Sequence, residues 1–100
     1  MSYRIEYSAE TESHLRALTA RQRAIVLDAV DEQLAYEPTV VTRQRKPMRP
    51  NPLAPWELRV GALRVYYDVE QSEPEARVLI RAVGLKLRNR VRIGREVIEL

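Results

Sequence analysis

The spacing of apolar residues changes once along this chain, and the change constrains the fold more than any other feature. In residues 20 to 36 the apolar side chains recur every three or four positions, as at Val26, Val30 and Leu34, which is the spacing of one helix face. From Trp56 to Val69 apolar and polar residues alternate instead, as in a strand with one buried face. A helical first half followed by strands predicts an α+β domain.

Local signals set the boundaries of the elements in the first half. The β-formers of YRIEY, residues 3 to 7, predict a first strand. Ser8 stands where it would cap a short helix from about Ala9 to Leu18. The sequence TARQ, residues 19 to 22, has the form of a capping box and begins a second helix from Ala20 to about Tyr36. Because so few residues join the two helices, we expect them to form an antiparallel pair.

The second half predicts a β-meander. Trp56 to Val60 and Leu63 to Val69 alternate as two strands, and Gly61-Ala62 between them predicts a tight turn. A third strand is expected from Ala76 to Val83, ended by Gly84. This meander and the preceding helices predict helices packed on one face of an antiparallel sheet.

The C-terminal segment LKLRNRVRIGREVIEL is expected to form a further strand or a hairpin turned at Gly94, with EVIEL as either the last strand or a tail. A chain of 100 residues with 45% apolar residues suffices for one modest core. Residues 1 to 100 are therefore expected to form a single domain.

Composition excludes several kinds of site. The chain has no cysteine and one histidine, His14, which excludes disulfides and thiolate metal sites and argues against a histidine-based zinc site. We therefore expect no metal and no cofactor. The N-terminal residues MSYRIEYSAETE lack the apolar core of a signal peptide, and no run reaches the roughly 18 apolar residues of a membrane span. A cytoplasmic protein without membrane contact is expected.

Charge is distributed unevenly along the chain. Residues 1 to 36 hold four basic and six acidic side chains, whereas residues 39 to 95 hold thirteen basic and five acidic ones. This asymmetry is typical of a protein that binds a polyanion, and an arginine-rich surface without such a partner is the alternative. Residues 37 to 55 hold five of the six prolines and predict a long functional loop. Its basic side chains, which would bind RNA phosphates or remain solvated, are Arg43, Arg45, Lys46 and Arg49.

The alternation in the hairpin sorts its side chains into two faces. The face that carries Leu58 and Val65 is expected to be core. The opposite face is expected to present Glu57, Arg59, Arg64 and Tyr66, joined by Arg81 from the next strand. Further cations follow Gly84 in the sequence and complete a predicted basic concavity that binds RNA: Lys86, Arg88, Arg90 and Arg92.

The order and spacing of these elements resemble a known family, the RelE/ParE superfamily of type II toxin–antitoxin toxins. The resemblance is carried by the opening strand, the helical pair, PWELRVGALRVYYDV and AVGLKLRNRV. It implies cleavage of mRNA in the ribosomal A site for the RelE-like branch, and inhibition of DNA gyrase for the ParE-like branch. In both branches it implies a cognate antitoxin that wraps the toxin in a hetero-oligomer.

The resemblance also implies roles for single residues. Arg64, in LRVYY, matches the arginine that RelE-like enzymes use at the phosphate. Arg59 matches a basic residue on the preceding strand, and Lys86 or Arg88 matches a basic residue after the VG pair.

Two positions depart from the family pattern. Several relatives have a catalytic tyrosine or histidine near the C-terminus, where this chain has Arg92 or Val91. One branch has a lysine where this chain has Glu57. The resemblance therefore leaves the catalytic base unassigned.

A metal-independent ribonuclease needs a base for the ribose 2′-hydroxyl, cations for the phosphate oxygens and an acid for the departing 5′-oxygen. Arginine suits the phosphate because its planar fork makes two hydrogen bonds and stays charged. Glu57 is our first candidate for the base, and Lys46, with a lowered pKa, is the second. Tyr66 is a candidate for stacking on a base or for the acid. In the alternative interpretation Glu57 pairs with Arg64 or Arg59, and Tyr66 is an ordinary sheet residue.

Three functions remain open from the sequence. The first is a ribosome-dependent mRNA endoribonuclease that inhibits translation. The second is a gyrase inhibitor of the ParE kind. The third is a degenerate member that only binds its antitoxin.

Overall fold

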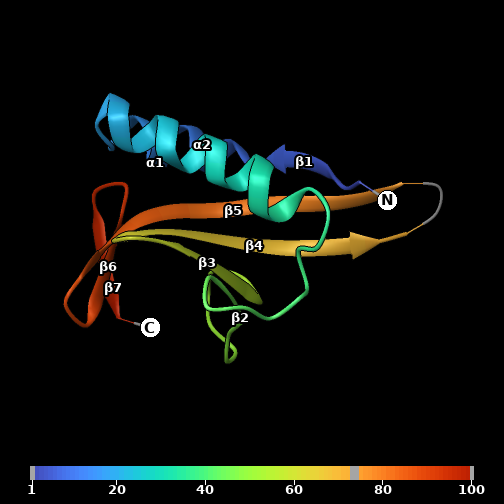
Figure 1. The fold of residues 1–100 in the computed structure, drawn as a ribbon. Helices are drawn as coiled ribbons and strands as arrows, with labels where there is room; N and C mark the ends of the chain where they lie inside the picture. The colour runs from blue at the N-terminus through green and yellow to red at the C-terminus, as the bar shows by residue number, and fades with distance from the viewer. Residues whose placement is uncertain (1, 73–74, 100) are drawn as a thin grey trace.

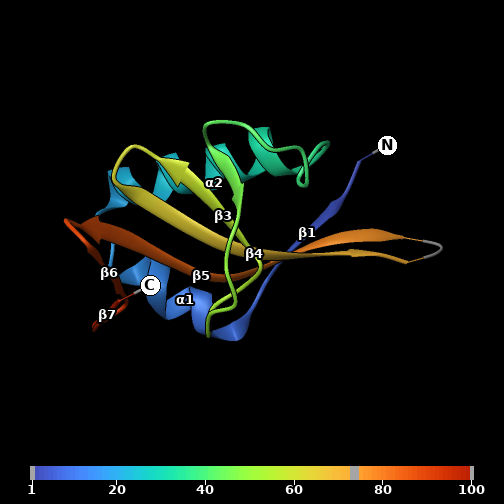
Figure 2. The ribbon, with the colours of Figure 1, turned by 90° about the horizontal axis from the view of Figure 1, so that it is seen from below.

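The computed structural model describes residues 2–72 and 75–99. Figure 1 shows the elements, which follow in the order β1 (Arg4–Tyr7), α1 (Ala9–Arg16), α2 (Ala20–Leu34), β2 (Arg45–Pro47), β3 (Trp56–Val60), β4 (Leu63–Gln71), β5 (Ala76–Leu87), β6 (Arg90–Ile93) and β7 (Glu96–Glu99). Both helices lie on the same face of one sheet (Figures 1 and 2). The predicted α+β architecture is confirmed.

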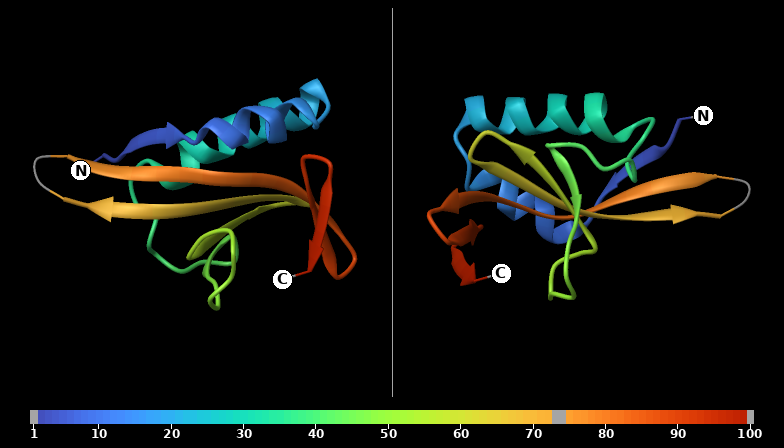
Figure 3. Two further views of the ribbon diagram at one scale, coloured as in Figure 1. Left: turned by 180° about the vertical axis from the view of Figure 1, so that it is seen from behind. Right: turned by 60° about the horizontal axis from the view of Figure 1, so that its bottom comes forward.

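The two helices pack on different strands of the sheet. The chain reverses at the short connection after α1, and α2 runs back antiparallel to it (Figure 3). α1 packs on β5, and α2 packs on β3 and β4. Within the described part of the chain, no helix is long and apolar enough to cross a membrane.

Local capping begins the second helix as the sequence predicts. The backbone N–H of Gln22 donates to the Thr19 hydroxyl at 3.1 Å, and the N–H of Thr19 donates to the Gln22 side chain at 3.0 Å. This is a complete capping box. Ser8 occupies the N-cap position of α1, but its side chain makes no capping hydrogen bond, so the capping role predicted for that side chain is wrong.

The sheet has the hydrogen-bonded order β2-β3-β4-β5-β6-β7, and β1 pairs with β5 off this path. The meander from β2 to β7 is antiparallel as predicted, and the first strand, β1, adds to it in a parallel pairing with β5. β6 pairs only with residues 84–87 of β5. The Arg77–Ile80 part of β5 is therefore not paired with β6, and β1 pairs with it instead.

The β3–β4 hairpin has the predicted strands and turn. Trp56 lies opposite Tyr67, and Val60 lies opposite Leu63. Gly61 adopts a φ of 58° in the turn, a conformation that glycine reaches without steric cost. Between the sheet and the helices lies the main core, which includes Val26, Val30, Leu34, Leu58, Val65, Tyr67, Val78 and Ile80.

Gly84 does not end the third strand, contrary to the sequence prediction. β5 continues to Leu87, and Gly84 pairs with both Arg64 and Ile93. A Cβ atom at Gly84 would lie 2.5 Å from the Arg92 carbonyl oxygen. The glycine therefore permits close approach of β6. The chain after it forms the β6–β7 hairpin, turned at Gly94 as predicted, and EVIEL contributes the last strand.

The second face of the sheet is also covered, contrary to the sequence prediction. Residues of the 48–54 loop and of the β6–β7 hairpin pack there around Tyr66 in a smaller core. In Figure 1 the 48–54 loop lies on the side of the sheet away from the helices, whereas the β6–β7 hairpin crosses the end of the sheet and its turn at Gly94 lies beside α1. The prediction that this hairpin face presents Tyr66 to solvent is wrong, because the ring is wholly buried.

The long loop before the hairpin has more structure than predicted. Arg45–Pro47 forms β2, which adds to the edge of β3 with Lys46 opposite Glu57. The N–H of Met48 also donates to the Pro55 carbonyl at 2.8 Å. The loop is therefore bound to the sheet at both of these points.

Candidate nucleic-acid interface

A pocket of about 310 Å³ opens on the loop side of the sheet. Its lining comes from β2 and the following loop, from β3, from the end of β5, from the β5–β6 turn and from β6. The charged residues of the lining are four cations and one carboxylate: Lys46, Arg49, Arg59, Lys86 and Glu57. We call this the basic pocket.

Strand pairing places these side chains together. Lys46 lies opposite Glu57 in the β2–β3 register, and Arg59 follows Glu57 by two residues, which puts both on one face of β3. Lys86 is near the end of β5, where its N–H donates to the Ala62 carbonyl at 2.7 Å. Residues far apart in sequence thus line one cavity.

Glu57 and Arg59 form an ion pair inside this pocket. The Arg59 Nε donates to Glu57 Oε1 at 2.6 Å. Glu57 is only 7% exposed, whereas the Arg59 side chain is 45% exposed. The ion pair foreseen as the alternative interpretation of Glu57 is present, and it holds the Arg59 guanidinium against a neighbouring carboxylate.

Tyr66 lies opposite Glu57 in the β3–β4 register. Burial, and after it the Glu57 carboxylate, raises the pKa of the Tyr66 hydroxyl, while Arg64 and Arg59 lower it. Within residues 2–72 and 75–99 no group completes a hydrogen bond with this hydroxyl. Because the ring exposes no surface, it does not stack on a base in this conformation.

Arg64 lies beside the basic pocket and is not part of its lining. It stands opposite Arg59 in the hairpin register. Its Nη1 donates to the carbonyls of Gly61 and Leu63 at 2.7 and 2.9 Å. The guanidinium is thus held at the hairpin turn, next to the strand position of Arg59.

Arg45 has a structural role and does not line the basic pocket. It is only 8% exposed, and its guanidinium donates to the carbonyls of Val40 at 3.0 Å and Gln33 at 2.6 Å. The side chain therefore ties the loop to the end of α2, and it is not offered to a ligand. Arg43, two residues earlier, is exposed.

The remaining predicted cations lie outside the lining of the basic pocket. Arg81 borders a different pocket near α1 and lies 3.8 Å from Asp68. Arg90 pairs with Glu99 at 3.3 Å, and Arg92 is half-buried. Arg88 stands exposed in the β5–β6 turn with a φ of 56°.

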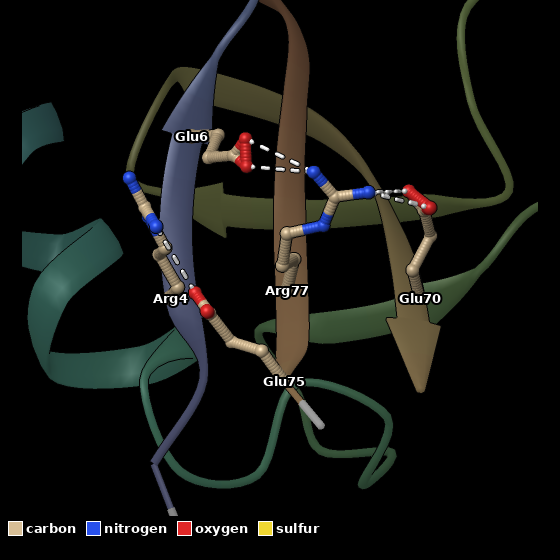
Figure 4. A network of polar contacts seen from close by, with 5 residues as sticks. All are labelled: Arg4, Glu6, Glu70, Glu75 and Arg77. Atoms are coloured by element: carbon tan, nitrogen blue, oxygen red, sulfur yellow. Dashed lines mark hydrogen bonds and ion pairs between the residues drawn. The ribbon is translucent and has the colours of Figure 1, made fainter. Parts of the chain in front are cut away.

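Among the described residues, carboxylates neutralise cations elsewhere on the sheet but leave three cations of the basic pocket unpaired. At the other end of the sheet Arg77 pairs with both Glu6 and Glu70, and Arg4 pairs with Glu75 (Figure 4). In the described part of the chain, no carboxylate lies within ion-pair distance of three pocket cations. These unneutralised cations are Lys46, Arg49 and Lys86.

Asn51, which was not predicted as a site residue, organises the loop wall of the pocket. Its Oδ1 accepts from the N–H groups of Leu53 and Ala54 at 2.7 and 3.1 Å. Its Nδ2 donates to the carbonyls of Arg49 and Ala54 at 2.7 and 3.0 Å. The neighbouring prolines have no N–H to donate, so one side-chain amide ties the loop together. The Asn-Pro pair in RPNPLAP, a turn signal, was the available hint.

Comparison with known proteins identifies the fold. No protein-family model and no curated protein matches this sequence. A solved structure does match it, namely the toxin–antitoxin complex RelBE2 from Mycobacterium tuberculosis. The match covers 86% of this chain and 100% of the matched chain, with a TM-score of 0.71 and 23% sequence identity. The protein therefore has a RelE-like α+β fold, and the resemblance seen in the sequence is confirmed at the level of the fold.

Proposed function

We propose that this protein is the toxin of a type II toxin–antitoxin module and acts as a ribosome-dependent mRNA endoribonuclease that inhibits translation in the cytoplasm. The observation that carries the proposal is the basic pocket, where Lys46, Arg49, Arg59 and Lys86 converge on a RelE-like fold. The similar solved structure is a toxin–antitoxin complex. We therefore propose a cognate antitoxin as the protein partner, and the ribosome with its mRNA as the target.

The proposed reaction needs only groups of the protein and of the RNA. The 2′-oxygen loses its proton to a base, attacks the adjacent phosphorus and displaces the 5′-oxygen, which takes a proton from an acid. Glu57 stands first for the base, because it is the carboxylate of the pocket. The pocket cations would stabilise the charge that develops on the phosphate oxygens.

Residues around the pocket would extend the contact with the RNA backbone. Phosphate contacts position a strand without reading its sequence. Arg64 is proposed to reach the same phosphate from the hairpin turn. The exposed or half-buried cations proposed for flanking phosphates are Arg43, Arg88, Arg90, Arg92 and Arg81.

One observation favours a second, non-nucleolytic candidate. The pocket lining drawn from the described residues includes neither histidine nor tyrosine, and its carboxylate is already paired with Arg59. A gyrase inhibitor, or a protein that only binds its antitoxin, would need no base. The nuclease remains our proposal because the unneutralised cations surround a cavity rather than a flat surface.

The proposal is tested by primer extension on a reporter mRNA in a translating extract. The native chain is compared with Arg64→Ala and Lys86→Ala variants, and with Arg4→Ala as a matched control. Arg4 is an exposed arginine of β1 that pairs with Glu75 (Figure 4), and neither residue lines the pocket. We expect ribosome-dependent cleavage by the native chain and the control, with a loss of at least about a hundredfold in the variants, as for removal of one transition-state donor.

Absence of cleavage by the native chain would refute the nuclease. A supercoiling assay with DNA gyrase would then separate the remaining candidates. Inhibition of supercoiling would identify a ParE-like activity, and undisturbed supercoiling would leave antitoxin binding alone.

A further inference from the structure

Tyr66 has an unexplained hydroxyl group. The side chain is wholly buried, and within the described ranges its hydroxyl has no hydrogen-bond partner. The adjacent Tyr67 is equally buried, but its hydroxyl donates to the Pro38 carbonyl at 2.6 Å. Buried polar groups without partners are rare and costly. The Tyr66 hydroxyl therefore lacks the partner that a buried polar group ordinarily has.

Glu57 is the nearest candidate for that partner. The two residues are directly opposite in the antiparallel β3–β4 register, where side chains on one face lie within contact distance. Both the charge of Glu57 and a side-chain hydrogen-bond interaction with it raise the pKa of the Tyr66 hydroxyl, so the two groups are close, but their geometry in this conformation is not that of a complete hydrogen bond. A carboxylate accepts several hydrogen bonds through two oxygens, but the contact formed here runs from Oε1 to Arg59.

Among the cations of the basic pocket, Arg59 is held in an ion pair. The ion pair at 2.6 Å holds it against Glu57, whereas Lys46, Arg49 and Lys86 have no such partner in the part of the chain that the structure describes. A phosphate entering the pocket would compete with Glu57 for the same guanidinium. Taking Arg59 away would leave a buried carboxylate unpaired, which is strongly unfavourable unless another donor replaces it.

We propose that Tyr66 is that replacement donor and therefore a positioning residue of the basic pocket. When a phosphate of a single-stranded RNA engages Arg59, the Glu57 carboxylate turns and accepts a hydrogen bond from the Tyr66 hydroxyl. Arg59 is thereby released to the phosphate while Glu57 stays satisfied. The inference rests on the proposed role of the pocket as a phosphate site, and it assigns the role of the orphaned hydroxyl.

The test uses binding, so that it does not depend on cleavage. The probe is a fluorescent single-stranded RNA hexamer with 2′-O-methyl groups, which has no free 2′-hydroxyl to attack the phosphate. Fluorescence anisotropy measures its affinity for the native chain, for Tyr66→Phe and for the matched control Tyr67→Phe. Loss of a hydrogen bond to a charged group changes a binding constant by about tenfold or more. We therefore expect Tyr66→Phe to weaken binding of the RNA probe by about tenfold.

Thermal melting separates this role from a structural one. Tyr66→Phe removes an unpaired buried hydroxyl, so its melting temperature should equal or exceed that of the native chain. Tyr67→Phe leaves the buried Pro38 carbonyl without its partner and should melt roughly 5 °C lower or more. Its affinity for the probe should be unchanged.

A double variant tests the coupling. Glu57→Gln removes the charge that holds Arg59, so the probe should bind more tightly, and adding Tyr66→Phe should then have no further effect. Equal affinity of the native chain and Tyr66→Phe would overturn the inference, as would a native chain that does not bind the probe. If the native chain binds the probe but cleaves no mRNA, the nuclease proposal fails while the Tyr66 comparison still decides this inference.

Discussion

Replacing Gly84 by alanine should destabilise the protein, because β5 and β6 are too close there for a side chain. The added Cβ would lie 2.5 Å from the Arg92 carbonyl oxygen and 2.9 Å from side-chain carbons of both Val91 and Ile93. Carbon atoms in favourable contact are roughly 3.5–4.0 Å apart. The β6 backbone would have to move away, and this also disturbs the strand end that carries Lys86.

The size of the effect follows from that crowding. Forcing one extra carbon into a packed site costs about 1–3 kcal/mol, and the upper value applies here because the nearest atom belongs to backbone. The reduced freedom of the unfolded chain returns up to about 1 kcal/mol. A net loss of about 2 kcal/mol lowers the melting temperature of a domain of this size by roughly 8–16 °C.

Thermal denaturation followed by circular dichroism measures this shift. Gly61→Asn is the matched control, because nothing lies within 4 Å of a Cβ at Gly61 and asparagine tolerates its positive φ better than other side chains do. The control should melt within a few degrees of the native chain. A Gly84→Ala variant with the native melting temperature would refute the close approach of the two strands.

Two further predictions concern the loop and the first helix. Asn51→Ala should cost about 1–3 kcal/mol, because Leu53 and Ala54 lose their side-chain acceptor, and it should speed proteolysis between Met48 and Ala54; an unchanged proteolysis rate would contradict this. Burial lowers the pKa of His14 from 6.5, against the raising influence of Glu10 and Glu96. Just below pH 6.5 the unfolded chain therefore binds more protons than the folded chain. The free energy of unfolding should fall as the pH drops below 6.5. Urea midpoints from about pH 8 to 5 should fall less for His14→Asn, which keeps an acceptor for the Val83 N–H; equal slopes for the two proteins would refute the assignment.

Local pattern predicted the elements whose signals lie close together in sequence. The capping box at Thr19, the Gly61 turn and the turn at Gly94 each depend on a few consecutive residues. Strand alternation likewise predicted that Leu58 and Val65 face the helices. Gly84 was misread because a glycine in a strand signals either an end or a close neighbour, and only the position of β6 distinguishes the two.

The candidate site likewise has features that the sequence predicted and features that it did not. The sequence predicted a basic concavity, and several of its residues line the basic pocket, including Lys46, Arg59 and Lys86. It did not predict that Arg45 would be buried against carbonyls of the chain, or that Asn51 would hold the loop. Both features depend on how the loop packs against the sheet, and no local periodicity in the sequence indicates that packing.

The sequence by itself determined the helices and most of the strands, because hydrophobic period and capping act between near neighbours in the chain. It also determined that thirteen of the 17 basic side chains lie in residues 39 to 95. The tertiary structure alone decided that both faces of the sheet are covered and that Tyr66 is buried beside Glu57. It did so because the covering loop and the β6–β7 hairpin reach that face through contacts between residues that are distant in sequence.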